Sequence, residues 1–325
     1  MKQSTRKRIA SLKSERFHQR AGSVIRVVRQ PSPRRVEASA FPSNRRRNYP
    51  SLISGSDWSR NIGVPLEYNI EELSNSVREA WNRTLSQLES QGHRILPISL
   101  PTTKAALSAY YVLAPAEASS NLAKYDGVRY GVRPSSSSSF ETHPHPDQTP
   151  TSSLYSHARG TNFGPEVHRR ILLGTYSLSS SAMHNYFIQA QKIRRLVQRD
   201  FDSVFKLRNP LHTHQPAPEM GVDYIICPTA PTPPPRMIDL KNSTPFDAYM
   251  NDVFTVPASL AGLPAASVPA ALSPESRHVN HANVGIQVIG QYGDDEAVVR
   301  FVQMEMQASR QETAHYTRRG KKRFL

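Results

Sequence analysis

The sequence contains only one cysteine, Cys227, among its 325 residues. A single cysteine cannot form an intramolecular disulfide, and a chain of this length can build a core without disulfides or a structural metal. The sequence also lacks any apolar run approaching the roughly 20 residues of a membrane-spanning helix. These absences predict a soluble chain with no membrane partner, held together by its hydrophobic core.

Acidic residues are scarce at both ends of the chain. Residues 1–50 carry 14 Lys/Arg against only Glu15 and Glu37, and residues 318–323 add five positive charges without an acid. Since the whole chain has a net charge of +15, the part in between carries about −2. The body is therefore not a basic domain of the kind that binds nucleic acid.

The first 60 residues are rich in Arg and Ser and show no sustained apolar periodicity. This composition is typical of a mitochondrial transit peptide and predicts location in the mitochondrial matrix. Two alternatives stay open: sequence left by a wrongly assigned gene start, and a nucleic-acid-binding arm, whose affinity would depend strongly on salt. We assign residues 1–60 to a basic, disordered leader and 311–325 to a basic tail.

The body, residues 61–310, begins with a pattern of strand, helix and strand. Asn69 and Glu72 have the spacing of a capping box, and Gly92 stands where a helix would stop. The run 94–100, "RILPISL", is short and apolar, which predicts a buried strand. Apolar residues recur between them at helical spacing, namely Leu73, Val77, Trp81, Leu85 and Leu88.

The same alternation continues downstream. Helical patterns cover 104–125, where Pro115 should break or kink the helix, and then 165–205 and 294–309. The apolar runs 223–229 and 284–291 read as strands. Alternating strands and helices predict an α/β fold with a mixed central sheet covered by helices.

Two segments interrupt this pattern, near 134–158 and 207–221, and both are rich in Ser, Pro, His and Thr. We expect surface insertions there. Their paired histidines lack the further ligands of a metal site, so we predict that no metal is bound. These pairs are His143 with His145 and His212 with His214.

Signatures of catalysis are also missing: there is no phosphate-binding loop, dinucleotide fingerprint, zinc-protease helix or nucleophile elbow. Ser179, Ser180 and Ser181 form a cluster inside a helical pattern, where packing or capping serines are expected.

Four stretches carry a family resemblance: "APAEASSNLAKYDGVRYG" at 114–131, "FGPEVHRRILLGTYSLSS" at 163–180, "CPTAPTP" at 227–233 and "NDVFTVPASLAGLPAASVP" at 251–269. Together they resemble the A subunits of glutamyl-tRNA(Gln) amidotransferases, which belong to the amidase signature family. The resemblance spans about residues 61–305, with the motifs in the family's order. It implies the C-terminal part of the amidase signature fold.

The resemblance implies an enzyme that releases ammonia from glutamine. The ammonia passes to a B subunit, which uses ATP and Mg to amidate Glu-tRNA(Gln), while a C subunit braces the pair. Hydrolysis in the family uses a Ser, cis-Ser and Lys triad in a Gly/Ser-rich loop and a strand-end motif. This sequence contains no such loop, and "SGSDWS" at 54–59 lies too close to the body to match it. The resemblance therefore implies no catalytic residue and no cofactor in this chain.

The substrate-binding residues implied by the resemblance are Tyr110, Arg170 and Asp252. An arginine suits the α-carboxylate of glutamine because its planar fork can donate two parallel hydrogen bonds. The carboxylate of Asp252 would bind the α-ammonium, and Arg169 replaces Arg170 if the register moves by one. Each residue also has an ordinary structural alternative. Tyr110 would be a core residue, Arg170 a charge on a helix surface, and Asp252 a cap for the segment from Val256.

Two further stretches carry predictions. The proline-rich run 228–235 should stop the preceding strand and form a wall of the binding site, which we prefer to a linker. Cys227, at the end of that strand, is expected to be a buried packing residue. The small residues of 258–272 predict a tight helix-to-strand turn, in which Gly262→Val would overfill the space and lower stability by ~1–3 kcal/mol.

Three functions stay open at this point. The first is the ammonia-releasing A subunit of which this sequence holds only part, in organellar translation. The second is a non-catalytic, partner-binding fragment. The third is a related amidase that acts on another amide.

Overall fold

The computed structural model describes residues 59–132, 158–211, 218, 220–235, 237–238, 249–270 and 284–303. The tail 311–325, both histidine pairs and nearly all of the leader lie outside these residues. The two interrupting segments are described only in part.

Within the described residues, five strands form one mixed sheet in the order β2-β1-β3-β5-β4. β1 runs parallel to β2 and β3, whereas β5 runs antiparallel to β3 and β4. This arrangement confirms the predicted α/β fold with a mixed sheet. The strands are β1 (Asn61–Pro65), β2 (Arg94–Ile98), β3 (Tyr224–Pro228), β4 (Ala265–Ala270) and β5 (Val284–Ile289).

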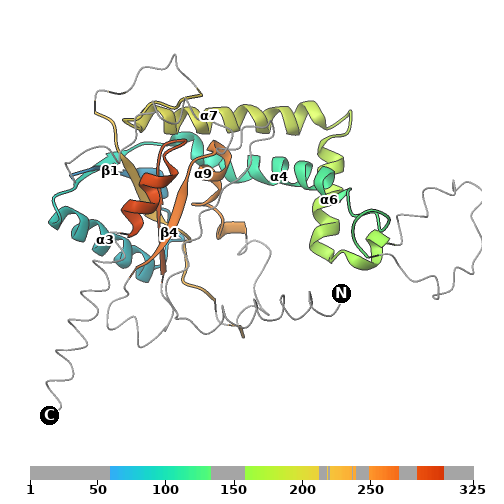
Figure 1. Cartoon of the computed structure of the whole chain (residues 1–325), viewed down its shortest axis with the longest axis horizontal. Helices are drawn as coiled ribbons and strands as arrows, with labels where there is room; N and C mark the ends of the chain where they lie inside the picture. Colours follow the sequence, from blue (N-terminus) through green and yellow to red (C-terminus); the bar gives the residue numbers. More distant parts are fainter. Residues whose placement is uncertain are drawn as a thin grey trace, which may run out of the picture.

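The helices extend well beyond the sheet. α4 contacts α7 along one side and packs against α6 in its second half, so that α6 lies away from the strands (Figure 1). No helix among the described residues is long and apolar enough to cross a membrane. The α-helices are α3 (Asn75–Ser90), α4 (Ala106–Leu122), α6 (Pro165–Ser177), α7 (Ile188–Val204), α9 (Val256–Ala261) and a last one over 295–303. Short helical turns are η3 (Leu66–Tyr68), η4 (Pro101–Ala105) and the π-helical η5 (Met183–Phe187).

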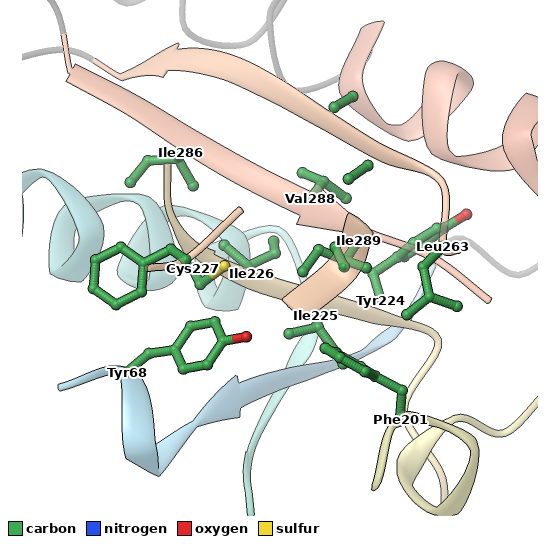
Figure 2. Close-up of a cluster of buried hydrophobic side chains, with 14 of the residues drawn as sticks. Tyr68, Phe201, Tyr224, Ile225, Ile226, Cys227, Leu263, Ile286, Val288 and Ile289 are labelled. Atoms are coloured by element: carbon green, nitrogen blue, oxygen red, sulfur yellow. The ribbon is translucent and has the colours of Figure 1, made fainter. Parts of the chain in front are cut away.

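The core lies around β3, all of whose residues are buried (Figure 2). Trp81 of α3 donates a hydrogen bond from Nε1 to the carbonyl of Ile226 at 3.2 Å. On the same strand, Tyr224 stacks on Phe301 of the helix 295–303, with ring centroids 4.4 Å apart. Two helices distant in sequence are thus fixed to one central strand.

The predicted capping box at the start of α3 is wrong. The helix begins at Asn75, with Ser74 as its N-cap, and not near Asn69. Asn69 instead accepts a hydrogen bond from the side chain of Arg78, while the backbone N–H of Ser74 donates to the carbonyl of Pro231 at 2.9 Å. Long-range contacts therefore decide where the helix begins, although Gly92, with a φ of 93°, follows its end as predicted.

The strand predicted to be buried at 94–100 is in fact an edge strand. β2 pairs only with β1 among the described strands, and each of its residues is exposed or half-buried. Its apolar composition does not distinguish an edge from a centre, because the position in the sheet depends on pairing.

The long helical pattern over 165–205 is divided in the structure. α6 ends at Ser177, and the π-helical η5 leads into α7. The serines 179–181 lie in the interruption, not within a continuous helix. Pro115, in contrast, does not end α4, which continues to Leu122.

The turn between α9 and β4 has the predicted helix-to-strand form, and a Cβ at Gly262 would not be crowded, while overfilling by the larger valine stays a prediction. A Cβ at this position would lie 3.9 Å from the ring of Tyr292, which is ordinary contact. The constraint is the backbone, since Gly262 has a φ of 77° in the left-handed region. Even a single methyl group, which has room there, is disfavoured by the backbone conformation.

Candidate substrate-binding site

A tyrosine of α4 and an aspartate far along the chain meet at the candidate site. Tyr111 Oη donates a hydrogen bond to Asp252 Oδ2 at 2.9 Å, across 141 positions of sequence. Asp252 lies in the turn that precedes α9. Its backbone carbonyl accepts hydrogen bonds from Thr255 and Val256, but its carboxylate points to Tyr111. The N-cap of α9 is Thr255, so the alternative of Asp252 as a side-chain cap does not apply.

Aromatic rings hold Tyr111 in place. The ring of Tyr249 lies 4.6 Å from it, and Tyr110 meets it edge-on at 5.4 Å between centroids. Burial, together with the hydrogen bond to Asp252, raises the pKa of Tyr111 to about 12. Tyr111 is therefore a neutral donor at physiological pH and keeps one oxygen of the Asp252 carboxylate occupied.

Arg170 lies on the neighbouring helix α6. Its charge acts on Tyr111, where it opposes the rise of the tyrosine pKa. Arg170 Nε pairs with Glu166 Oε1 at 2.9 Å, and this hydrogen bond raises the pKa of the guanidinium. Within the described part of the chain, the hydrogen bond of Arg170 uses Nε alone. Its terminal amino groups remain available for a carboxylate.

The two arginines considered from the sequence differ in their surroundings. The side chain of Arg169 is 62% exposed and that of Arg170 is 42% exposed, and both pair with Glu166. The tyrosines Tyr110 and Tyr111 contribute electrostatically to the raised pKa of Arg170. Arg170 is thus the less exposed of the two arginines and is coupled electrostatically to the tyrosines.

Tyr110 and Asp252, named from the resemblance, both lie close to Tyr111, and Arg170 acts on it electrostatically. The hydrogen bond to Asp252 comes from the adjacent Tyr111, while Tyr110 is half-buried and packs on that ring. Sequence reasoning missed Tyr111 and Tyr249. The doubled tyrosine of "SAYYVLAP" was a signal for the first; no pattern pointed to the second.

The proline-rich run after β3 is attached to the body near this site. The carbonyl of Pro231 accepts the hydrogen bond from Ser74, and Thr232 Oγ1 lies 3.3 Å from Asn251 Oδ1, next to Asp252. These contacts place the run beside the candidate site. This position fits a wall of the site better than a free linker.

Cys227, at the end of β3, is linked through Gln287 to the segment that follows Asp252. Cys227 is fully buried, and burial raises the pKa of its thiol to about 12, so the expectation of a packing residue is confirmed. Gln287 Nε2 lies 3.5 Å from its sulfur and donates to the carbonyl of Phe254 at 3.1 Å. Among the described residues, no group of three or more His, Cys, Asp or Glu could hold a metal ion.

Comparison with known families decides the broader assignment. The family model described as Amidase matches residues 20–299, which is most of the chain. The chain belongs to the amidase family. The match begins inside the basic first segment and ends in the last described helix.

Curated relatives refine this likeness within the amidase family. The mitochondrial A subunit of glutamyl-tRNA(Gln) amidotransferase from Coccidioides posadasii is 57% identical over 249 residues, covering 73% of this chain and 48% of the relative. Its counterpart of the same name from Emericella nidulans is 52% identical over 300 residues, covering 86% of this chain and 57% of the relative. The amidase-family chain thus spans about half the length of the curated relatives it matches.

A solved structure has a similar fold. An allophanate hydrolase from Kluyveromyces lactis superposes with a TM-score of 0.51 at 13% identity, covering 77% of this chain and 32% of that one. Identity this low supports the fold alone.

Proposed function

We propose that this chain is the glutamine-binding portion of an amidotransferase A subunit, which releases ammonia so that Glu-tRNA(Gln) becomes Gln-tRNA(Gln). One observation carries the proposal: Asp252 is hydrogen bonded to Tyr111, and Arg170 on the adjacent helix interacts with the same tyrosine. A cation and an anion that both act on one tyrosine, on partly exposed elements, suit a zwitterionic amino acid. The names of the curated relatives support glutamine as that amino acid.

Each side chain has a distinct role in this proposal. The terminal amino groups of Arg170 bind the α-carboxylate through parallel hydrogen bonds. Asp252 binds the α-ammonium, using carboxylate capacity that Tyr111 does not occupy. Tyr111 orients Asp252, and Tyr110 packs behind it as part of the pocket wall. The side-chain amide of glutamine then points away from the two charges.

Hydrolysis itself requires residues that this sequence does not contain, since the family's serine loop and lysine have no counterpart in it. We therefore expect the 325-residue chain by itself to bind glutamine without releasing ammonia. ATP and Mg are proposed for the partner B subunit, where the amidation of Glu-tRNA(Gln) takes place.

The proposed partners are the B and C subunits of the amidotransferase. The word "subunit" in the relatives' names supports an assembly. Large apolar side chains on α6 and η5 also support protein contacts, because clustered exposed apolar residues mark interaction surfaces. We call this set the α6 apolar face; its members are Leu172, Leu173, Tyr176 and Tyr186. Co-purification of the full chain with tagged B and C subunits tests the assignment, and recovery of neither would contradict it.

Glutamine recognition can be tested with ligands that each lack one charged group. Glutaramate has no α-ammonium, and 4-aminobutanamide has no α-carboxylate. We expect Asp252→Asn to weaken glutamine binding by about 10- to 100-fold with little effect on glutaramate, since one charged hydrogen bond contributes ~1.5–3 kcal/mol. We expect Arg170→Gln to weaken glutamine equally and to spare 4-aminobutanamide. Isothermal titration of the full chain measures all of these affinities.

Arg169→Gln is the matched control, because Arg169 carries the same charge and pairs with the same Glu166 on the outer surface. Its affinity for glutamine should stay within about twofold of the parent chain. Equal losses from Arg169→Gln and Arg170→Gln would overturn the assigned roles, as would an unaltered chain that binds the three ligands equally.

Location in the mitochondrial matrix is proposed with residues 1–60 as its signal. Support comes from the basic, Ser-rich composition and from relatives named as mitochondrial. A fluorescent protein fused after residue 60 should enter isolated mitochondria and become protease-resistant. Replacement of the cluster Arg45–Arg46–Arg47 by glutamates should reduce import, and import independent of the leader's charge would contradict the proposal.

A further inference from the structure

α4 and α6 approach each other unusually closely at Gly174. A Cβ added to this residue would lie 2.9 Å from the Cβ of Ser119 and 2.5 Å from the carbonyl carbon of Pro115, and nearer still to its oxygen. Because the Pro115 atoms belong to the backbone, no change of rotamer can relieve this contact. Any side chain at position 174 would have to push the two helices apart.

Helical spacing links this crossing to the candidate site. Residues four apart on a helix lie on the same face, so Arg170 shares a face with Gly174, and Tyr111 shares one with Pro115. The crossing is thus one turn away from both side chains. Gly174 and Ser177 are the buried residues of α6, which agrees with this face being the one turned to α4.

Pro115 adds a second constraint at the same place. It lies inside α4 and has no N–H, so it cannot donate the usual helical hydrogen bond to the carbonyl of Tyr111. The turn that carries Tyr111 is therefore held less by its own helix and more by its neighbours. Those neighbours are Tyr249, Asp252 and, through the crossing, α6.

We propose that Gly174 is a positioning residue that sets the separation between Arg170 and the Tyr111–Asp252 pair. The inference rests on the proposed glutamine-binding function. Both charged groups of an amino acid are attached to one carbon, so the cation and anion that bind them must keep a fixed separation. By allowing direct backbone contact between α6 and Pro115, Gly174 provides that separation and makes the site selective for zwitterions.

A glycine-to-alanine substitution tests this role. Gly174→Ala should weaken glutamine binding by about 10- to 100-fold, because a misplacement on the order of 1 Å has effects of this size on oriented sites. Glutaramate and 4-aminobutanamide, which each need only one of the two charges, should change by less than about threefold. Loss of zwitterion selectivity with single-charge binding intact is a readout that simple unfolding would not produce. Gly160→Ala is the matched control, since nothing lies within 4 Å of its added Cβ.

A second variant covers the case in which Gly174→Ala does not fold, as judged by circular dichroism. Ser119→Leu keeps Gly174 and places a larger side chain on α4 at the same crossing, where it should push the two helices apart. We call Gly174→Ala and Ser119→Leu the wedge variants and expect the same loss of selectivity from both. If Arg170→Gln and Asp252→Asn impair glutamine binding while the wedge variants keep the parent selectivity, the positioning role is overturned and the proposed function stands. If Arg170→Gln and Asp252→Asn have no effect on glutamine binding, the positioning role and the proposed function are both overturned.

Discussion

Cys227 shows how its surroundings make a reactive residue inert. The thiolate is the reactive form of cysteine, and a pKa of about 12 keeps Cys227 protonated at neutral pH. Burial in the central strand also denies access to reagents. We expect no reaction with a chromogenic disulfide reagent at pH 8 in the folded chain, and one thiol per chain after denaturation in guanidinium. Full labelling of a chain with native circular dichroism would contradict the buried position.

The same residue predicts how stability depends on pH. Its pKa is raised in the folded state from 9.0 to about 12, so the stabilising effect of burying the neutral thiol is present below pH 9 and is lost progressively between pH 9 and 12. Cys227→Ala should lower the free energy of unfolding by ~1 kcal/mol at pH 7. The difference from the parent chain should shrink as the pH rises above 9, in urea titrations of both proteins. A difference that is constant up to pH 11 would show that the thiol does not titrate in this way.

Helix α3 is joined to the sheet by one buried hydrogen bond. Trp81→Phe removes the donor to the carbonyl of Ile226 and part of the ring, so we expect the free energy of unfolding to fall by ~1–3 kcal/mol. Urea denaturation followed by circular dichroism measures this loss. Glu79→Gln, at an exposed position of the same helix, should stay within about 0.5 kcal/mol of the parent chain. Equal stability of Trp81→Phe and the parent would exclude a structural role for the bond.

Substitutions in the turn after α9 can show whether backbone conformation or lack of space favours glycine at position 262. Gly262 donates from its N–H to the carbonyl of Ala258 at 3.0 Å with a φ of 77°. Gly262→Ala should cost about 1 kcal/mol, and Gly262→Asn should cost less, because asparagine tolerates the left-handed region better than alanine does. In thermal denaturation, the melting temperature should therefore be highest with glycine at position 262, lower with asparagine and lowest with alanine. The reverse order of the last two would favour overfilling, since asparagine is the larger side chain.

The exposed α6 apolar face is expected to make the whole molecule prone to self-association. Leu172 is 71% exposed and Leu173 49% exposed, so the α6 apolar face is open to solvent in the isolated chain. Replacing both leucines by lysine should reduce self-association in light scattering without lowering the melting temperature. Leu66→Lys is the control, because Leu66 is 62% exposed but lies outside this face. A melting temperature lowered by several degrees in the double variant would show that these leucines are packed.

Much of the fold was open to prediction because it depends on local pattern. The strands at 223–229 and 284–291 were predicted from short apolar runs, and the end of α3 from Gly92. The start of α3 was not, since the N–H of Ser74 is engaged by Pro231, about 157 positions later in sequence. The edge position of β2 likewise depends on strand pairing, which apolar composition does not encode.

The amino-acid sequence by itself determined the composition of the chain: its lone cysteine, its basic ends around a nearly neutral body, the alternation of strands and helices, and the motifs that place it in the amidase family. Only the tertiary structure decided which of two adjacent residues in the sequence takes part in the candidate site. Adjacent residues on a helix point about 100° apart, so Tyr111 rather than Tyr110 reaches Asp252, and Arg170 is less exposed than Arg169. That choice depends on how α4, α6 and the turn before α9 pack together, and the close approach of α6 to α4 at Gly174 is part of this packing.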